Sequence, residues 1–260
     1  MSANDGAVHL RRDGPVAHVT FDRPAARNAM TWAMYEGLSA ACERIAADTE
    51  VRVAVFRGAG GKAFVAGTDI AQFRDFKSGE DGTRYERVME AHLAAVEELK
   101  VPTLAMIEGW AVGGGLAIAT ACDLRIATPG SRFGVPIART LGNCLSVGNI
   151  ALIAAAFGLA RTKRMLLLAE MLTADEALTA GFLSEIVPAE GLDARVAEIC
   201  GRLAANAPIT MRVTKEAIRR LLHAGLPAGD DLIRECYGSR DFRIGVEAFV
   251  EKREPRWTGS

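Results

Sequence analysis

Hydrophobic residues along this chain alternate between short strand-like runs and helical stripes. Residues 16–21, 51–56, 103–107 and 123–127 form short runs typical of buried strands. Between them, residues 28–48 and 88–99 carry apolar residues every three or four positions, which predicts amphipathic helices. Strands that alternate with helices favour parallel crossover units, and after about Leu145 the pattern becomes mostly helical. We therefore predict an α/β core followed by a helical C-terminal part.

Local signals place the ends of several elements. Asp13-Gly14 stands between two strand-like runs and predicts a hairpin. Thr173 and Glu176 form a capping box at the start of a helix, and Gly181 fits the C-terminal stop of that helix. Further helices are predicted at 192–205, 210–223 and 230–250, and the last of them is expected to break near Gly238.

A charged stretch from Arg74 to Arg87 interrupts this pattern. It contains Gly79 and Gly82, and glycine gives the backbone conformational freedom. Charged side chains are rarely buried. We predict that this stretch is exposed and mobile, and that helix resumes at Val88.

The residues from Gly109 to Asp123 place three consecutive glycines, 113–115, between a predicted strand and an alanine-rich helix. Glycine lets a backbone approach a ligand closely, and the N–H groups at a helix N-terminus carry partial positive charge. These properties suit a site that holds developing negative charge. The alternative is that the glycines only allow the helix to pack closely, and the stretch by itself supports both interpretations.

Composition narrows the function classes. The 260 residues carry a formal net charge of −1, which gives no basic field for nucleic acid or anionic membranes. Five cysteines without a C-x-x-C pair predict reduced thiols, and the four histidines form no H-E-x-x-H metal motif. The first residues, Met1–Asp5, are polar, and no apolar run reaches membrane-spanning length. We therefore expect a cytoplasmic protein with no metal, nucleic-acid or membrane partner.

Two stretches, Phe64–Ile70 and Gly109–Asp123, resemble the paired signatures of the enoyl-CoA hydratase/isomerase (crotonase) superfamily. Residues 21–30 resemble its N-terminal signature, and residues 132–136 resemble its central loop. Residues 173–187 resemble its capped-helix segment, and Asp241 with residues 249–253 resembles its tail. The motifs follow the family's order over nearly the whole chain, so the set is far more specific than any one motif.

The resemblance implies a crotonase-like spiral of ββα units over residues 1–195. It also implies a helical trimerisation region over residues 196–260, with assembly as a homotrimer or a dimer of trimers. A coenzyme A thioester would be the substrate, without a permanently bound cofactor. By their place in the motifs, the residues near the coenzyme A or acyl group would be Ala25, Arg27, Ala66, Asp69, Ile70, Phe249 and Lys252. For Lys252 the alternative is an ordinary solvated lysine, and for Asp69 it is a structural hydrogen bond.

The resemblance also implies a chemistry. In the family, two backbone N–H groups bind the thioester oxygen, and by position these belong to Ala66 and Gly114. Donors placed where charge develops stabilise an enolate more than the ground-state carbonyl. The two glutamates of the family's hydratases are replaced here by Ala117 and Ile137, which cannot carry a proton.

Nearby polar residues could supply the proton-carrying group that Ala117 and Ile137 lack. Thr68 stands where some decarboxylases of the family carry a functional polar residue, and Arg139 and Asn143 follow the central loop. Further candidates are Glu108, Glu235 and Tyr237. Each of them could instead be an ordinary solvated or packing side chain. Three functions remain open. The first is a nominal enoyl-CoA hydratase/isomerase, and the second is a decarboxylase, C–C hydrolase or isomerase with a displaced base. The third is a non-catalytic acyl-CoA-binding subunit.

Overall fold

The larger of two sheets is mostly parallel. The computed structural model describes residues 6–260, so the polar segment Met1–Asp5 lies outside the described residues. The sheet has the order β1-β2-β3-β5-β7-β10. β1 and β2 form the hairpin predicted at Asp13-Gly14, and the other neighbours pair parallel. The strands are β1 (Ala7–Asp13), β2 (Val16–Asp22), β3 (Val53–Gly58), β5 (Thr103–Ile107), β7 (Leu124–Ala127) and β10 (Glu185–Ile186).

The smaller sheet has the order β4-β6-β8-β9 and receives one strand from each successive turn of the chain. Its strands are β4 (Ala63–Val65), β6 (Trp110–Val112), β8 (Arg132–Gly134) and β9 (Leu172–Thr173). β3, β5 and β7 of the larger sheet are followed by β4, β6 and β8 of the smaller one, and each pair leads into a helix. This repetition confirms the predicted spiral of ββα units.

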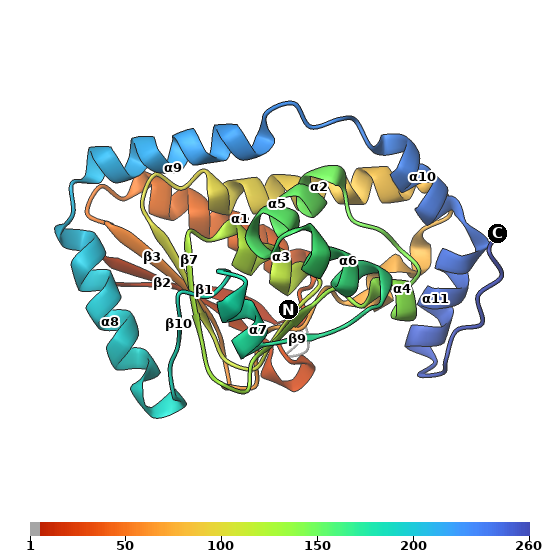
Figure 1. Ribbon diagram of the computed structural model, residues 1–260, viewed down its shortest axis with the longest axis horizontal. Coiled ribbons are helices and arrows are strands. Elements are labelled where there is room, and N and C mark those ends of the chain that lie inside the picture. The colour runs from red at the N-terminus through yellow and green to blue at the C-terminus, as the bar shows by residue number, and fades with distance from the viewer. Residues whose placement is uncertain (1–5) are drawn as a thin grey trace.

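Helices cover both faces of the larger sheet. Figure 1 shows α8 at one end of the molecule, α9 along one edge, and α10 with α11 at the opposite end. Successive residues of β3 point to opposite faces. Ala54 and Phe56 pack in the main core with α1, and Val53 and Val55 pack under α8. The helices are α1 (Trp32–Ala47), α2 (Gly79–Glu97), α3 (Gly114–Ala121), α4 (Ile137–Thr140), α5 (Val147–Phe157), α6 (Leu159–Leu167), α7 (Ala174–Thr179), α8 (Ala189–Ala205), α9 (Pro208–His223), α10 (Asp230–Gly238) and α11 (Arg240–Val250). Two 3₁₀ turns, η1 (Pro24–Ala26) and η2 (Ile70–Asp75), complete the list.

Most of the predicted boundaries are confirmed. Thr173 and Glu176 form the predicted capping box of α7, and Gly181 follows that helix with a positive φ of 79°. The predicted break near Gly238 separates α10 from α11. The predicted domain boundary after residue 195 falls inside α8, and the division into two regions stays a prediction. Among residues 6–260, no helix has both the length and the apolar composition needed to cross a bilayer.

The prediction for the stretch from Arg74 to Arg87 is wrong about where the helix begins and about Glu86, although most of its charged side chains are exposed as predicted. Most of it forms the end of η2 and the first half of α2, which starts at Gly79 behind a capping box of Ser78 and Asp81. Its glycines allow close packing against α10. A Cβ at Gly82 would lie 2.2 Å from Cγ of Tyr237, and one at Gly79 would lie 2.2 Å from the carbonyl oxygen of Arg234. One face of this half of α2, with Gly82, Thr83 and Glu86, is therefore buried, while Glu80, Arg84 and Arg87 are exposed.

Candidate active site

A cavity of about 160 Å³ lies where the two sheets' loops meet α2 and the C-terminal helices. Its lining is mainly apolar and comes from six parts of the chain. They are Tyr35 of α1, the 66–73 segment, residues 85–93 of α2, the glycine turn with α3, the 135–149 segment, and Phe249 of α11. A pocket of this kind, apolar with a few convergent polar groups, is typical of a small-molecule site. Within residues 6–260, no group of three His, Cys, Asp or Glu side chains is placed to hold a metal ion.

The three glycines of the turn have different roles. Gly113 has φ 54° and ψ −120°, a conformation that side-chain-bearing residues rarely adopt, and its N–H donates to the carbonyl of Gly134 at 2.9 Å. Gly115 is a packing glycine, because a Cβ there would lie 2.0 Å from the carbonyl oxygen of Val65. Gly114 lines the cavity and is the first residue of α3, so its N–H has no acceptor within the helix. The packing interpretation therefore holds for Gly115, and the charge-binding interpretation stays a prediction for Gly114.

The 66–68 segment lies beside this turn and differs from the expectation in one respect. The N–H of Ala66 donates to the carbonyl of Arg27 at 3.1 Å, which occupies the donor that the resemblance assigned to the thioester oxygen. Two residues on, the N–H of Thr68 makes no hydrogen bond within residues 6–260. A Cβ at Gly114 would lie 3.2 Å from Oγ1 of Thr68, so the two segments touch. Among residues 6–260, the N–H groups of Thr68 and Gly114 are thus two unoccupied donors in adjacent segments that line the cavity.

Three hydroxyl groups meet at the same place. Thr68 Oγ1 is hydrogen-bonded to Tyr35 Oη at 2.8 Å and to Tyr85 Oη at 3.3 Å. Burial raises the pKa of Tyr35 to about 12 and raises the pKa of Tyr85 well above its usual value. Both phenols therefore stay protonated at neutral pH and can donate hydrogen bonds towards the cavity.

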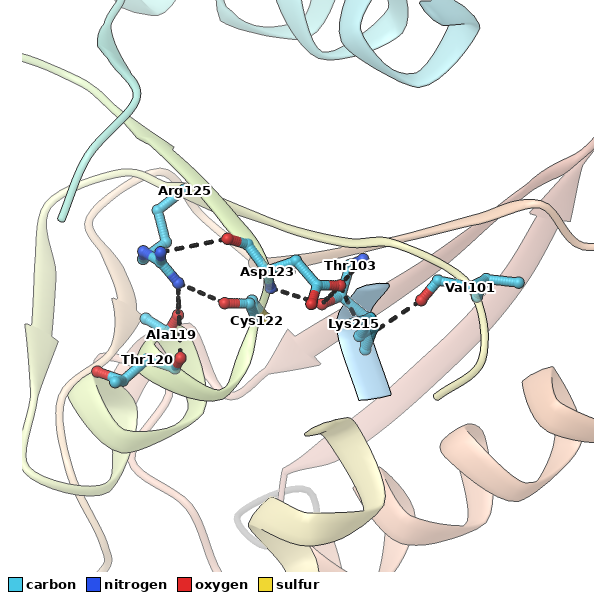
Figure 2. A network of polar contacts seen from close by, with 8 residues as sticks. All are labelled: Val101, Thr103, Ala119, Thr120, Cys122, Asp123, Arg125 and Lys215. Atoms are coloured by element: carbon cyan, nitrogen blue, oxygen red, sulfur yellow. Dashed lines mark hydrogen bonds and ion pairs between the residues drawn. The ribbon is translucent and has the colours of Figure 1, made fainter. Parts of the chain in front are cut away.

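A polar network at the other end of α3 holds the turn in place. Figure 2 shows the guanidinium of Arg125 among the last carbonyls of α3, where it donates to Ala119 at 3.3 Å and to Asp123 at 3.2 Å. A cation at a helix C-terminus complements the helix dipole. The carboxylate of Asp123 accepts hydrogen bonds from the Thr103 N–H at 2.7 Å and from Lys215 Nζ at 2.7 Å. Asp123 therefore has a structural role, and α3 is fixed to β5 and α9.

The structure brings some of the predicted site residues together and separates others. Ala66, Thr68, Ile70, Gly114, Asn143 and Phe249 line the cavity, as do Ala117 and Ile137 at the positions of the missing glutamates. Arg139 is exposed on α4 and does not line it. Asp69 caps η2 through the Ala71 N–H and pairs with Arg23 at 2.9 Å, so it has the structural role considered as its alternative.

Three of the residues expected near the coenzyme A, Ala25, Arg27 and Lys252, lie outside the cavity lining. Ala25, Arg27 and Lys252 are exposed, and the guanidinium of Arg27 lies over the ring of Trp110 at 6.0 Å. A stacked guanidinium on an exposed indole is a flat, cationic surface of the kind that suits a nucleotide. Their role towards coenzyme A stays a prediction.

Sequence reasoning missed Glu86, because it lies in the stretch that was predicted to be exposed. Its side chain is buried, with the residue only 2% exposed, and it lines the cavity. Tyr237 Oη donates to its Oε1 at 2.7 Å, and the Ser146 N–H donates to its Oε2 at 3.0 Å. Burial is the largest influence on this carboxyl and raises its pKa to about 7. A helical stripe that included residues 82, 86, 89, 93 and 96 would have been the available signal.

The raised pKa of Glu86 makes stability depend on pH in a defined direction. The folded state holds its proton up to about pH 7, while the unfolded state loses it near the ordinary value of 4.5. The folded state therefore binds more protons in this interval, and the free energy of unfolding falls as pH rises through it. Glu86→Gln cannot ionise, so its stability relative to the wild type should rise between about pH 5 and about pH 8.

Urea denaturation of the wild type and of Glu86→Gln, at about pH 5 and at about pH 8, measures this difference in stability. Glu43→Gln is the matched control, since Glu43 is an exposed glutamate on α1 and is not among the groups that shift the pKa of Glu86. A stability difference between Glu86→Gln and wild type that is the same at both pH values would contradict the assignment.

Comparison with known proteins gives a consistent result. Residues 11–260 match the enoyl-CoA hydratase/isomerase family. The chain is 32% identical to a short-chain-enoyl-CoA hydratase of Clostridium acetobutylicum, over 95% of each protein. It is also 32% identical to an (E)-benzylidenesuccinyl-CoA hydratase of Thauera aromatica, over 97% of this chain and 99% of the relative.

Solved structures support the same conclusion. A methylmalonyl-CoA decarboxylase in complex with 2-nitronate-propionyl-CoA superposes with a TM-score of 0.89, at 26% identity and over 98% of this chain and 99% of the other. An enoyl-CoA hydratase/carnitine racemase of Magnetospirillum magneticum superposes with a TM-score of 0.80, at 34% identity, over 99% and 98% of the two chains. The order of the motifs, the ββα spiral and these matches over nearly the full length agree, and the chain belongs to the enoyl-CoA hydratase/isomerase family.

Proposed function

We propose that this protein is an enzyme that acts on an acyl-CoA thioester and stabilises the thioester enolate between the N–H groups of Thr68 and Gly114. The observation that carries the proposal is that both N–H groups are unoccupied and belong to adjacent segments that line one apolar cavity. Thr68 takes the place first assigned to Ala66, whose N–H is bonded to Arg27. Losing one such donor in other enzymes costs about 10²- to 10³-fold in rate.

The rest of the site suits an acyl group whose charge develops at one end. The thioester oxygen would lie at the N-terminus of α3, where the helix dipole adds to the two hydrogen bonds. The acyl chain would lie against Phe73, Met89 and Leu93, which line the same cavity. The relatives named above as hydratases support a lyase or isomerase assignment, nominally an enoyl-CoA hydratase/isomerase.

Decarboxylation is the second candidate. Loss of CO₂ from a malonyl-type thioester leaves the electron pair of the broken C–C bond to form the enolate, so this step needs no base. The replacement of the two glutamates by Ala117 and Ile137 is compatible with such a reaction. The superposition with a methylmalonyl-CoA decarboxylase supports it as well.

Self-association is part of the proposal. α9 has no buried residue, and it exposes Ile209, Val213, Ile218 and Leu221. Exposed apolar faces of this kind are typical of interfaces. We infer that further copies of this chain cover α9 in a homotrimer or a dimer of trimers.

We also infer that the compartment is the cytoplasm, and that coenzyme A is present only as part of the substrate.

A panel of thioesters tests the proposal. The protein is incubated with crotonyl-CoA, a 3-enoyl-CoA and methylmalonyl-CoA, and products are identified by mass spectrometry while binding is measured by calorimetry. We expect at least one thioester to be converted. Water addition to crotonyl-CoA favours the hydratase, a shifted double bond favours the isomerase, and loss of CO₂ favours the decarboxylase. Binding without any conversion would replace the proposal by a non-catalytic acyl-CoA-binding subunit.

A further inference from the structure

One carboxylic acid lines the cavity, and it comes from neither of the two positions at which the family's hydratases carry glutamates. Among the described residues that line it, Glu86 is the only carboxylic acid, and it shares the lining with Ala117 and Ile137. It reaches the cavity from α2, whereas the two missing glutamates would have come from α3 and α4. A buried carboxylic acid in a pocket that binds a reactive thioester needs a role, because burial of its charged form is unfavourable.

The surroundings of Glu86 orient the carboxyl group without neutralising it. Within residues 6–260, no Lys, Arg or His forms an ion pair with it, and its two oxygens accept hydrogen bonds from Tyr237 and from the Ser146 N–H. Tyr237 Oη in turn accepts a hydrogen bond from Asn143 Nδ2 at 3.2 Å. The carboxyl group is therefore held in one orientation by neutral donors, and its proton affinity is not lowered by a cation.

Asn143 adds an independent sign of a missing polar partner. Its Oδ1 is buried and makes no hydrogen bond to any described residue, although the side chain lines the cavity. Buried polar atoms in folded proteins are normally paired, with protein, water or ligand. A polar group in the cavity, such as a water molecule or a substrate hydroxyl, would complete this pairing next to Tyr237 and Glu86.

A second cavity shares part of its wall with the first one at Glu86. This cavity has a volume of about 500 Å³, and Glu86, Leu93 and Asn149 line both cavities. The second one is the more polar of the two, with Arg87, Glu90 and His223 in its wall. Glu86 thus stands in the wall between an apolar acyl pocket and a polar space, which is the position that a group exchanging protons with solvent requires.

We propose that Glu86 is the acid–base residue of this site and performs the proton transfer that residues 117 and 137 cannot perform. This inference rests on the proposed function. The carboxylate of Glu86 takes a proton from the acyl carbon next to the thioester carbonyl, and the C–H electron pair forms the enolate double bond. The carbonyl π pair moves to the thioester oxygen, which the N–H groups of Thr68 and Gly114 stabilise. The protonated Glu86 then returns the proton to carbon or exchanges it with solvent.

The acidity of Glu86 suits this step near neutral pH. Burial and the charge of Glu90 raise its pKa, the hydrogen bonds from Tyr237 and Ser146 lower it, and the balance is about 7. A general base works best when its pKa lies near the working pH. The titratable groups that face Glu86 are Tyr85 and Glu90 of α2, Tyr35 of α1, Cys144 of the 141–146 loop, and Cys236 and Tyr237 of α10.

Deuterium exchange at the α-carbon of butyryl-CoA in D₂O tests the inference, because this saturated thioester can be neither hydrated nor isomerised. Mass spectrometry follows the exchange, and calorimetry measures butyryl-CoA binding in parallel. We expect Glu86→Gln to bind butyryl-CoA as the wild type does and to exchange about 10²- to 10⁴-fold more slowly. Glu43→Gln, exposed on α1 and lining neither cavity, should exchange at the wild-type rate.

The pH profile of the wild type gives a second readout that needs no variant. Its exchange rate should rise as pH increases through about 7 and then level off, as the carboxylate forms. Exchange by Glu86→Gln at the wild-type rate, or a wild-type profile that is flat across this interval, would overturn the role of Glu86. In that case conversion of any thioester in the panel would leave the proposed function standing, whereas absence of all conversion and exchange would remove both.

Discussion

Arg125→Ala is expected to lower the free energy of unfolding by about 3 kcal/mol or more, because it removes a buried cation that several carbonyls share. The guanidinium donates to Phe182 at 2.7 Å and to the carbonyls of Ala119 and Asp123. It also lies 4.8 Å from the centre of the Phe182 ring. Alanine would leave these carbonyls unpaired and would leave a void beside the ring. Denaturant unfolding followed by circular dichroism measures the effect.

Two further variants separate this explanation from a general loss of charge. Arg125→Lys keeps the charge but offers a single donor group in place of the planar fork, so it should recover only part of the stability. Arg84→Ala removes an exposed arginine that pairs with Asp81 on α2, and it should change stability little. An Arg125→Ala protein as stable as Arg84→Ala would show that the carbonyls find other partners.

Gly114→Ala is expected to lower kcat/KM by about 100-fold while the protein stays folded. The new Cβ would lie 2.4 Å from Tyr35 Oη and 3.2 Å from Thr68 Oγ1. These groups must move, and Thr68 carries one of the two proposed donors, so the thioester oxygen loses its aligned hydrogen bonds. The rate is measured with the thioester that the panel identifies, and circular dichroism checks the fold.

A double-mutant cycle with Tyr35→Phe supplies the control. Without the phenol oxygen, the nearest Tyr35 atom to the new Cβ is Cζ at 3.7 Å, an ordinary contact distance. Gly114→Ala should therefore cost much less in the Tyr35→Phe background than in the wild type, as expected for residues in contact. Losses that multiply independently would contradict the steric explanation.

The features predicted well from sequence depend on neighbours in the chain. The stripe of Met34, Leu38, Cys42 and Ile45 predicts the buried face of α1, and all four side chains are buried. The hairpin at Asp13-Gly14 and the break near Gly238 also rest on local backbone preferences. Such signals need no knowledge of tertiary structure, and the ordered motifs then supply the ββα spiral.

The features predicted poorly depend on contacts between distant parts of the chain. Glu86 is buried because Tyr237, 151 residues away, and Ser146 surround it, and the many charges around it in the sequence hide the helical stripe on which it lies. The occupied N–H of Ala66 likewise depends on the carbonyl of Arg27, which belongs to another segment. The motif predicts which segment would bind the thioester oxygen. The hydrogen-bond pattern of the folded chain is needed to tell which N–H groups of that segment are free to do so.

The close contact between α2 and α10 at Gly82 affects the acidity of Glu86, and it offers a position through which evolution could change that acidity. Since Gly82 has no side chain, α10 approaches α2 closely enough for Tyr237 to bond to Glu86. That bond lowers the proton affinity of the carboxyl, so the spacing of two helices sets an acid strength. A residue with no atom in the cavity can therefore adjust the chemistry. Selection could shift the working pH of this site through volume at position 82, while the glycine turn and its charge-stabilising donors stay unchanged.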